Sequence, residues 1–326
     1  MTSSSGPHPR VLVFTEDCDP TADVVLARLN ERGVPFWRVD PGDFLAELGL
    51  SAIFDGTWSG TLWGQLRGVD LDGLRAVYYR RPSGFRTPEG LTEVERTFAR
   101  SQARHALSGV LSALPRVLWV NEPAKMADAR VKAHQLAVAA WCGLTTPLTL
   151  ITNRPDEVVA FGRRVGRIIT KSLAIVNVRE NEQTGVLYTA EVPETDWNHS
   201  GIAATAHLFQ ELVPRLYEVR MTFVAGQCFA TAMEPNDPDG PVDIRAHSER
   251  VTHTAIQVPD RIVESVSAMM DRYGLVFGTF DFIVRPDGHW VFLELNPNGQ
   301  WAWTEHAAGL PISIALADLL EKGATA

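Results

Sequence analysis

Three oxygen-bearing side chains near the C-terminus could hold a divalent cation. Asp281 precedes a Pro-Asp-Gly tripeptide, and Glu294 and Asn296 follow it on a returning run of apolar residues. Glu294 and Asn296 are two residues apart, so in a β-strand their side chains share one face. Carboxylate and amide oxygens suit Mg²⁺, which usually also binds substrate phosphates. The spacing therefore predicts a magnesium site on a β-hairpin.

The alternative for these residues is a solvated polar edge of a sheet. Apolar residues surround them, namely Phe282, Ile283, Val291, Phe292, Leu293 and Leu295. A carboxylate in such surroundings is unfavourable unless a charge compensates it, which favours the metal site.

If magnesium marks a nucleotide, basic side chains should reach its phosphates. Lys132 stands on an expected helix, and Lys171 ends the apolar strand RIITK. Arg220 in YEVRMTF and Arg245 in VDIR are further cations on expected strands. Taken alone, each lysine is more typical of a surface residue, so their assignment depends on the magnesium site.

The main chain of the segment FQELVPRLYEVR could form hydrogen bonds with the edge of a purine, while a carboxylate accepts hydrogen bonds from the ribose hydroxyls. Glu211 and Glu218 are seven residues apart in it, on either side of Val213 and a proline. A plain linker between two lobes explains the same residues equally well.

Alternating strands and helices precede these residues. RVLVFT is a short apolar run, the next segment has apolar residues at helical spacing up to Gly33, and VPFWRVD follows as a second strand. This alternation predicts a parallel sheet covered by helices, and so an α/β fold. A hairpin or small meander at 51–64, a strand AVYYRR and one long helix from Glu89 to Leu114 are also expected.

The second half of the chain predicts a different arrangement. ARVKAHQLAVAAWCGL reads as a helix stopped at Gly143, and a polar-capped helix over 153–167 leads into the strand RIITKSL. From Tyr217 onward the pattern indicates long antiparallel strands, with Pro-Asp-Gly as a hairpin turn. No repeat or linker separates the parts, so the lobes are expected to pack into one unit with clefts between them.

Length and composition narrow the classes of protein. The 326 residues suggest about two domains or one large multi-lobed one. With 45% hydrophobic residues the chain can build a core, which excludes intrinsic disorder. A net charge of −9 argues against a nucleic-acid partner. No apolar stretch is long enough for a membrane span or a signal peptide, so we expect a cytoplasmic protein without a membrane partner.

The cysteines predict neither a disulfide framework nor a zinc site. Cys18, Cys142 and Cys228 are odd in number, widely spaced and form no CxxC motif. We expect three reduced residues that serve in packing.

Taken in order, these motifs resemble the ATP-grasp superfamily. They are Lys132, Lys171, Gln210-Glu211-Leu212-Val213, Glu218, Asp281 and Glu294-Leu295-Asn296-Pro297, and the spacing of the acidic hairpin fits that of the D-alanine ligases. More narrowly, VYYRRP, the segment beginning NEPAKMADARVKAHQ, VDIR and LELNPNGQWAW resemble the ATP-grasp ribosomal peptide maturases, the graspetide synthetases. The likeness covers essentially the whole chain.

The resemblance implies an ATP-grasp fold made of three units. They are an N-terminal open α/β pre-ATP-grasp domain at 1–123, a small central lobe at 124–210 and a C-terminal lobe at 211–326 that carries the metal site. It further implies an ATP- and Mg²⁺-dependent ligase that forms an acyl phosphate on a carboxylate. In the maturases the substrate is a ribosomally made precursor peptide, whose Asp or Glu side chains close macrocyclic esters or amides.

The resemblance also implies a role for each motif residue. Mg²⁺ would lie on Asp281, Glu294 and Asn296, and the phosphates on Lys132, Lys171 and Arg220. The adenine would contact Glu211, Leu212 and Val213, and the ribose Glu218. Asp243 and Arg245 match a DxR element expected to contact the peptide, with Arg245 orienting the acceptor carboxylate. Arg80 and Arg81 would either do likewise or be ordinary surface charge.

Other features depart from the family pattern or stay open. The small lobe of the superfamily usually covers the phosphates with a glycine-rich loop, but SLAIVNVRENEQTGV offers only Gly185. Side chains would have to substitute for its backbone amides. Trp301 and Trp303 suit core packing better than the lining of a peptide cleft. A homodimer is compatible with the resemblance.

Two further classes of function fit the same motifs. One is an ATP-grasp ligase that joins a free amino acid or amine to a carboxylate. The other is a phosphotransferase or nucleotide-binding protein on the same scaffold.

Overall fold

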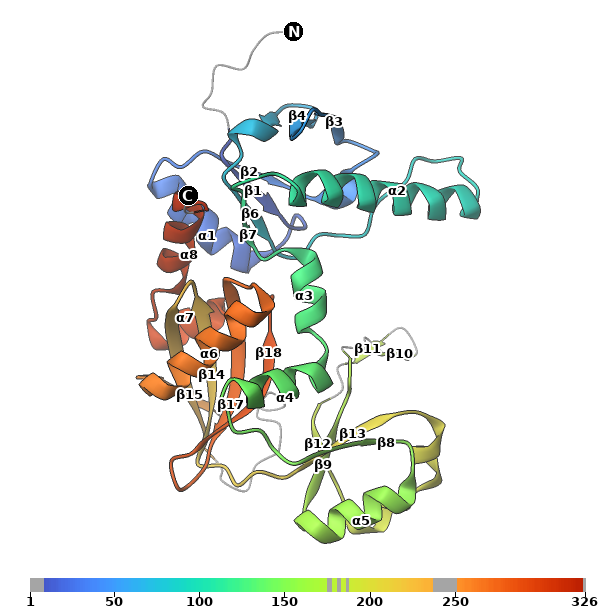
Figure 1. Cartoon of the computed structure of the whole chain (residues 1–326), viewed down its shortest axis with the longest axis vertical. Coiled ribbons are helices and arrows are strands. Elements are labelled where there is room, and N and C mark those ends of the chain that lie inside the picture. Colours follow the sequence, from blue (N-terminus) through green and yellow to red (C-terminus); the bar gives the residue numbers. More distant parts are fainter. Residues whose placement is uncertain (1–8, 175–177, 181–182, 186–187, 237–250, 325–326) are drawn as a thin grey trace.

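The computed structural model describes residues 9–174, 178–180, 183–185, 188–236 and 251–324 (Figure 1). Its N-terminal part contains a parallel sheet in the order β2-β1-β6-β7. The strands are β1 (Val11–Phe14), β2 (Phe36–Val39), β6 (Ala76–Tyr79) and β7 (Leu118–Val120). The predicted parallel α/β arrangement is therefore confirmed.

Both faces of this sheet are buried, which explains the unbroken apolar run in β1. Val11 and Val13 pack in one cluster with α1 (Pro20–Glu31) and the C-terminal helix α8 (Ile312–Lys322). Leu12 and Phe14 pack in another cluster, on the opposite face. That cluster includes residues of α2 (Glu93–Ser112) and of a small sheet of β3 (Gly49–Phe54), β4 (Trp58–Trp63) and β5 (Gly68–Asp70). The two ends of the chain thus share a core.

Two predicted helices have different bounds in the structure. The helix expected from Glu89 begins at Glu93, because Thr92 and Glu95 form a capping box that fixes the start. The helix expected from the segment ARVKAHQ is divided into α3 (Pro123–Ala129) and α4 (Lys132–Trp141). The break places Lys132 at the first turn of a separate helix.

The small lobe is an antiparallel sheet in the order β12-β9-β13-β8, with helix α5 (Pro155–Val165) against it. The strands are β8 (Thr149–Thr152), β9 (Ile168–Lys171), β12 (Ala190–Val192) and β13 (His207–Glu211). A separate pair is formed by β10 (Val178–Glu180) and β11 (Gln183–Gly185). Short 3₁₀ turns lie at η1 (Pro41–Asp43), η2 (Leu71–Gly73), η3 (Glu194–Asp196) and η4 (Ser200–Ala204).

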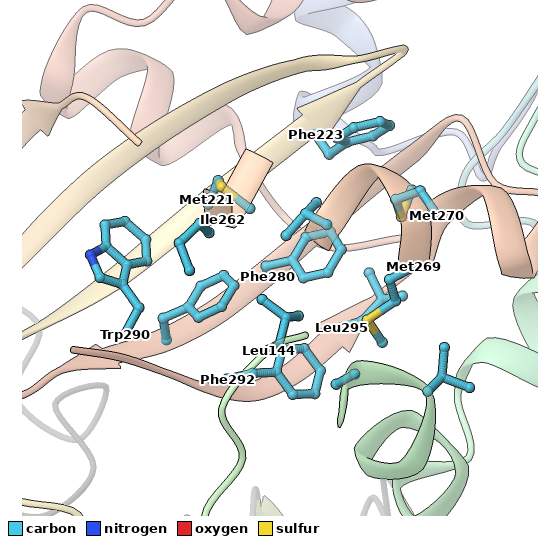
Figure 2. Packing of buried hydrophobic residues seen from close by; sticks show 14 of the residues in the cluster. Leu144, Met221, Phe223, Ile262, Met269, Met270, Phe280, Trp290, Phe292 and Leu295 are labelled. Carbon is cyan, nitrogen blue, oxygen red and sulfur yellow. The ribbon is translucent and has the colours of Figure 1, made fainter. Parts of the chain in front are cut away.

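The C-terminal lobe is a five-stranded antiparallel sheet in the order β16-β15-β14-β17-β18. Its strands are β14 (Tyr217–Val224), β15 (Gln227–Pro235), β16 (Val251–Ile256), β17 (Phe277–Val284) and β18 (Trp290–Asn296). One face packs on α6 (Asp260–Tyr273), as Figure 2 shows for Phe280, Phe292 and Leu295 against Met269 and Met270. Helix α7 (Ala302–Ala308) follows the last strand. The Pro-Asp-Gly turn is confirmed, since Gly288 has a φ of 80°.

One extra residue in β18 changes the pairing of the last hairpin. Phe282 pairs with Phe292, as a regular antiparallel ladder requires. One residue earlier in β17, Asp281 pairs with Glu294 instead of Leu293. This register shift is a β-bulge, and bulges are known to redirect side chains next to active sites.

The bulge decides which face carries the acidic side chains. In a regular strand Glu294 would lie on the same face as Phe292, inside the core. With the bulge, Phe292 and Leu295 both lie in the core cluster. Glu294 and Asn296 are consequently on the opposite face, the one that carries Asp281.

The expectation that all three cysteines serve in packing is wrong for one of them. Cys18 is exposed and is therefore not a packing residue, whereas Cys142 and Cys228 are partly buried.

Within the described ranges, no helix combines the length and apolar character needed to cross a membrane. The unit boundaries at 123 and 210 stay predictions.

Candidate active site

Two carboxylates stand side by side on the sheet face that the bulge creates. Asp281 and Glu294 are directly opposite each other in neighbouring strands, and their side chains are 22% and 25% exposed. Like charges in that arrangement repel unless a cation lies between or beside them. Arg220 Nη1 lies 2.7 Å from Asp281 Oδ1, and Lys132 Nζ lies 3.1 Å from Glu294 Oε2. The structure therefore brings together both predicted acidic ligands and two predicted phosphate-binding cations.

Asn296 completes the predicted ligand set. It is two residues beyond Glu294 on the same face, and its neighbour across the ladder is Thr279. The Asn296 Oδ1 atom accepts a hydrogen bond of 3.1 Å from the Asn298 backbone N–H. This bond orients the amide oxygen at the end of β18.

The donor set fits magnesium better than a softer metal. Among the residues that the structure describes, no cluster of three or more His, Cys, Asp or Glu side chains forms a metal site. Mg²⁺ needs fewer protein ligands than that, because it keeps waters and binds phosphate oxygens. Two carboxylates and the amide oxygen of Asn296 could hold it, with the remaining positions left to water and phosphate.

Lys132 links the small lobe to the C-terminal lobe. Its ammonium group contacts Glu294 of the large lobe and donates a hydrogen bond of 3.1 Å to the carbonyl of Ser172, next to Lys171 in the small lobe. Figure 1 shows α4 at the junction of these lobes. A cation in the first turn of a helix opposes the helix dipole. The position of Lys132 therefore indicates a binding role rather than helix stabilisation.

Arg220 has a donor that suits an anionic ligand. The residue lies on β14, opposite Asp281 in the ladder, and its side chain is 14% exposed. Its Nη2 donates to the carbonyl of Gln300 at 3.1 Å, but its buried Nε–H has no hydrogen-bond partner among the residues that the structure describes. An unsatisfied buried donor is unfavourable, so a phosphate oxygen would be a fitting partner.

The predicted adenine-binding segment connects the small lobe to β14. The backbone N–H of Glu211 donates to Leu148 O at 3.0 Å, and its carboxylate accepts from Leu148 N–H at 3.0 Å. The Leu212 N–H donates to Arg167 O at 2.9 Å, and Val213 is 7% exposed. The segment is thus anchored to the small lobe.

Glu218, the residue predicted for the ribose, lies on β14 beyond that segment. Arg215 Nη1 is 2.6 Å from its Oε1 atom, and both side chains are largely buried. The pair fixes the carboxylate at the junction between the lobes.

The residues predicted to contact a peptide have different surroundings. Arg81 is on the surface, with a 57% exposed side chain 3.7 Å from Glu16. Arg80 is instead buried, with only 1% of its surface exposed. Asp243 and Arg245 lie outside the described residues. Of the two tryptophans, Trp301 is fully buried in the core as expected, whereas Trp303 is 40% exposed and contacts the His253 ring.

Two buried amides that the sequence analysis missed hold the main chain around Asn296. Gln135 on α4 donates to Leu295 O at 2.7 Å and accepts from Leu295 N–H at 2.9 Å. Asn121, after β7, donates to Pro297 O at 2.8 Å. In the sequence both look like ordinary polar residues, and only their burial reveals the role.

Comparison with known proteins identifies the fold. Residues 10–127 match the family described as the MvdD pre-ATP grasp domain. The macrocyclase MdnB from Microcystis aeruginosa is 29% identical, with a TM-score of 0.77 over 96% of this chain and 99% of that chain. The macrocyclase MdnC from the same organism, bound to precursor peptide MdnA, is 26% identical, with a TM-score of 0.82 over 96% and 99%. This chain is an ATP-grasp ligase.

A third structure supports the fold of this ATP-grasp ligase. The RiPP-associated ATP-grasp ligase of Chryseobacterium gregarium, in complex with ADP and a leader and core peptide, has a TM-score of 0.87 over 96% of both chains, at 23% identity. A search among curated proteins gave no match. The predicted fold class and the resemblance to the peptide maturases are confirmed.

Gly299, in the loop after β18, allows this ATP-grasp ligase to bring the loop against β17. A Cβ atom at Gly299 would lie 1.7 Å from the Thr279 Oγ1 atom. We expect Gly299→Ala to lower the free energy of unfolding by about 1–3 kcal/mol through overpacking. Thermal unfolding of the variant and of the unsubstituted chain measures this change in stability.

Gly109→Ala is the matched control for that substitution. Gly109 lies within α2, and apart from its chain neighbours and the helix backbone no atom of the described residues is within 4 Å of the position of its Cβ atom. Alanine there should raise stability by about 0.5–1 kcal/mol. Equal effects from the two substitutions would contradict the close approach at Thr279.

Proposed function

We propose that this ATP-grasp ligase modifies a ribosomally made precursor peptide. It would join Asp or Glu carboxylates to Ser, Thr or Lys side chains of the same peptide, giving macrocyclic esters or amides. The observation that carries this proposal is the pairing of Asp281 and Glu294 with Arg220 and Lys132 at the junction of the lobes. The structural similarity to the macrocyclases MdnC and MdnB supports the choice of substrate.

The reaction has an electrostatic problem that these residues address. An anionic carboxylate must approach the polyanionic triphosphate of ATP. Lys132, Lys171 and Arg220 would bind the phosphates and offset that repulsion. Mg²⁺, held by Asp281, Glu294 and Asn296, would supply further charge stabilisation for the transferring phosphoryl group.

The covalent chemistry proceeds in two steps. A carboxylate oxygen of the peptide attacks the γ-phosphorus of ATP, the bond to the bridging oxygen breaks, and ADP leaves. The hydroxyl or amine nucleophile then attacks the acyl carbon, loses its proton, and inorganic phosphate leaves. Each linkage therefore consumes one ATP and removes the elements of one water from the peptide.

Binding of the remaining groups follows the sequence prediction. Glu211, Leu212 and Val213 would contact the adenine, and Glu218 the ribose. Asp243, Arg245 and Arg81 would contact the peptide, where local positive charge guides an acidic core despite the negative total. ATP and a ribosomal product are both present in the cytoplasm, where we place the reaction. A homodimer stays a prediction.

Mass spectrometry of a candidate precursor tests the proposal. A suitable peptide would be short, rich in Thr and Asp/Glu, and encoded by a neighbouring gene; it is incubated with the full chain, ATP and MgCl₂. We expect loss of one water per linkage and one ADP formed for each, with no change when ATP is omitted. A gain of phosphate would support the phosphotransferase alternative. Attachment of an added free amino acid would support the other ligase class.

A further inference from the structure

Arg80 occupies an unusual place for an arginine. It follows β6 directly, its side chain is fully buried, and its guanidinium lies 5.9 Å from the Tyr78 ring centre. Its Nε atom is 3.4 Å from Asp19 Oδ2, and Asp19 is 2% exposed. Two opposite charges are therefore enclosed in the N-terminal domain.

The other side of the guanidinium holds the loop that follows β18. Nη1 donates to Asn298 Oδ1 at 3.2 Å and to Gly299 O at 3.3 Å, and Nη2 donates to Gln300 Oε1 at 3.4 Å. The Asn298 amide in turn donates to the Arg80 carbonyl. The planar guanidinium thus contacts Asp19 and three successive residues of the C-terminal lobe, whereas a lysine ammonium has only three N–H donors.

This loop is connected directly to the candidate magnesium and phosphate site. The Asn298 N–H orients the Asn296 amide oxygen, and the Gln300 carbonyl accepts a hydrogen bond from Arg220. Arg220 also pairs with Asp281. A displacement of the loop would therefore move one proposed metal ligand and one proposed phosphate-binding cation.

Asp19 fixes the Arg80 guanidinium on the side of the N-terminal domain. It caps α1 by accepting from the N–H groups of Thr21 and Ala22, and it accepts from the Thr15 hydroxyl at 2.8 Å. Burial alone would raise the pKa of Asp19, but the Arg80 charge and these hydrogen bonds outweigh it and leave the pKa below its usual value. The carboxylate is therefore charged and holds Arg80 at neutral pH.

The buried Asp19–Arg80 ion pair is not well explained by a contribution to folding stability alone. Apolar residues of similar volume often replace a buried ion pair with no loss of stability. The contacts to three loop residues give this pair a second task, which apolar residues could not perform.

We infer that Arg80 is a positioning residue of the nucleotide site, through which the N-terminal domain fixes the loop Asn298–Gln300 and so places Asn296 and Arg220. This inference rests on the proposed function of the site. It also replaces the predicted peptide contact of Arg80, because the guanidinium is enclosed between Asp19 and the loop.

Calorimetric titration of the full chain with ADP in MgCl₂ tests the inference. Arg80→Lys keeps a positive charge beside Asp19 but loses the planar fork. We expect it to weaken Mg·ADP binding by about tenfold to a hundredfold, as is typical for outer partners of metal ligands. The KM for ATP should rise, whereas the KM for the peptide should not.

Arg32→Lys is the matched control. Arg32 also joins the N-terminal domain to the C-terminal lobe, through Asp318 and Glu321 of α8, and lies among residues that take no part in the site. Its substitution should change Mg·ADP affinity by less than about twofold. The same small change in Arg80→Lys, or a rise in the peptide KM alone, would overturn the inference.

A second variant keeps the test decisive if Arg80→Lys does not fold. Asn298→Ala leaves the Asp19–Arg80 pair intact and removes the loop side of the contact. It should weaken Mg·ADP binding in the same direction, and the double variant should lose little more than the stronger single one. Additive losses would overturn the inference. Failure of the unsubstituted chain to bind Mg·ADP would overturn the proposed function as well.

Discussion

Asp281→Asn is expected to abolish ATP-dependent turnover and to leave the fold intact. The substitution preserves shape but removes one of two anionic ligands that we assign to Mg²⁺. A bound cation contributes several kcal/mol to phosphoryl transfer, so we expect turnover to fall by about a thousandfold or more. ADP release in the presence of the peptide measures this, and Mg·ADP binding should weaken in parallel.

The fold should tolerate this change because two effects oppose each other. Loss of the carboxylate weakens the ion pair with Arg220, whose Nη1 lies 2.7 Å from Asp281 Oδ1. The same loss removes repulsion from Glu294, the residue directly across the ladder. Because these effects offset each other, the free energy of unfolding should change by no more than about 1–2 kcal/mol, less than the cost of breaking a fully buried pair.

Asp287→Asn provides a control within the same hairpin. Asp287 lies in the turn between β17 and β18, with a 50% exposed side chain beside Arg285 and His289. It carries the same charge as Asp281 but is not among the residues assigned to the metal, the phosphates or the peptide, so turnover should be unchanged. Turnover by Asp281→Asn within tenfold of the unsubstituted chain would contradict the metal assignment.

The acidic residues on the last hairpin could be predicted only in part from the pattern of residues in the sequence. Apolar residues around Pro-Asp-Gly predicted the hairpin, and the two-residue spacing of Glu294 and Asn296 predicted their common face. The predicted magnesium site includes Asp281 with them, but neither pattern by itself requires that Asp281 lies on that face too. A regular ladder would place Glu294 with Phe292 in the core, and only the bulge at Leu293 brings the carboxylates together. A one-residue irregularity leaves no periodic signal in a single sequence.

Long-range contacts of polar residues were equally inaccessible. Thr92 and Glu95 are three residues apart, so their capping box could have been read from the sequence. Arg80 and Asn298 are 218 positions apart, and nothing in RRP distinguishes a buried arginine from an exposed one. The adjacent arginines differ in their contacts, since Arg80 is 1% exposed and contacts Asp19 and Asn298, whereas Arg81 is on the surface near Glu16. Such differences arise from tertiary packing and not from local preference.

Lys132→Met is the second substitution with a large expected effect. Methionine keeps much of the apolar stem but removes the charge that contacts Glu294 and the Ser172 carbonyl. Loss of one preorganised donor to a reacting group typically lowers turnover by about a hundredfold to a thousandfold. We expect kcat/KM for ATP to fall by that factor, whereas Lys132→Arg should retain part of the activity.

The dependence on ligand charge separates phosphate binding from a structural role. The affinity loss in Lys132→Met should grow from adenosine, which has no phosphate, to ADP and then to a non-hydrolysable ATP analogue. Adenosine binding should change by less than about twofold. An equal loss for all three ligands would mean that Lys132 holds the lobes together and does not bind phosphate.

Lys125→Met tests whether the loss of any lysine charge near α4 lowers turnover. Lys125 is on α3, just before α4, and its 49% exposed side chain pairs with Glu122 at 3.1 Å. An exposed pair of this kind contributes about 0–1 kcal/mol, so neither stability nor turnover should change much.

Lys132 differs because it is 18% exposed and contacts both lobes. Its charge also opposes the dipole of α4, so its removal should not weaken that helix. A loss of turnover in Lys132→Met without a lower melting temperature would therefore locate the effect in the nucleotide site.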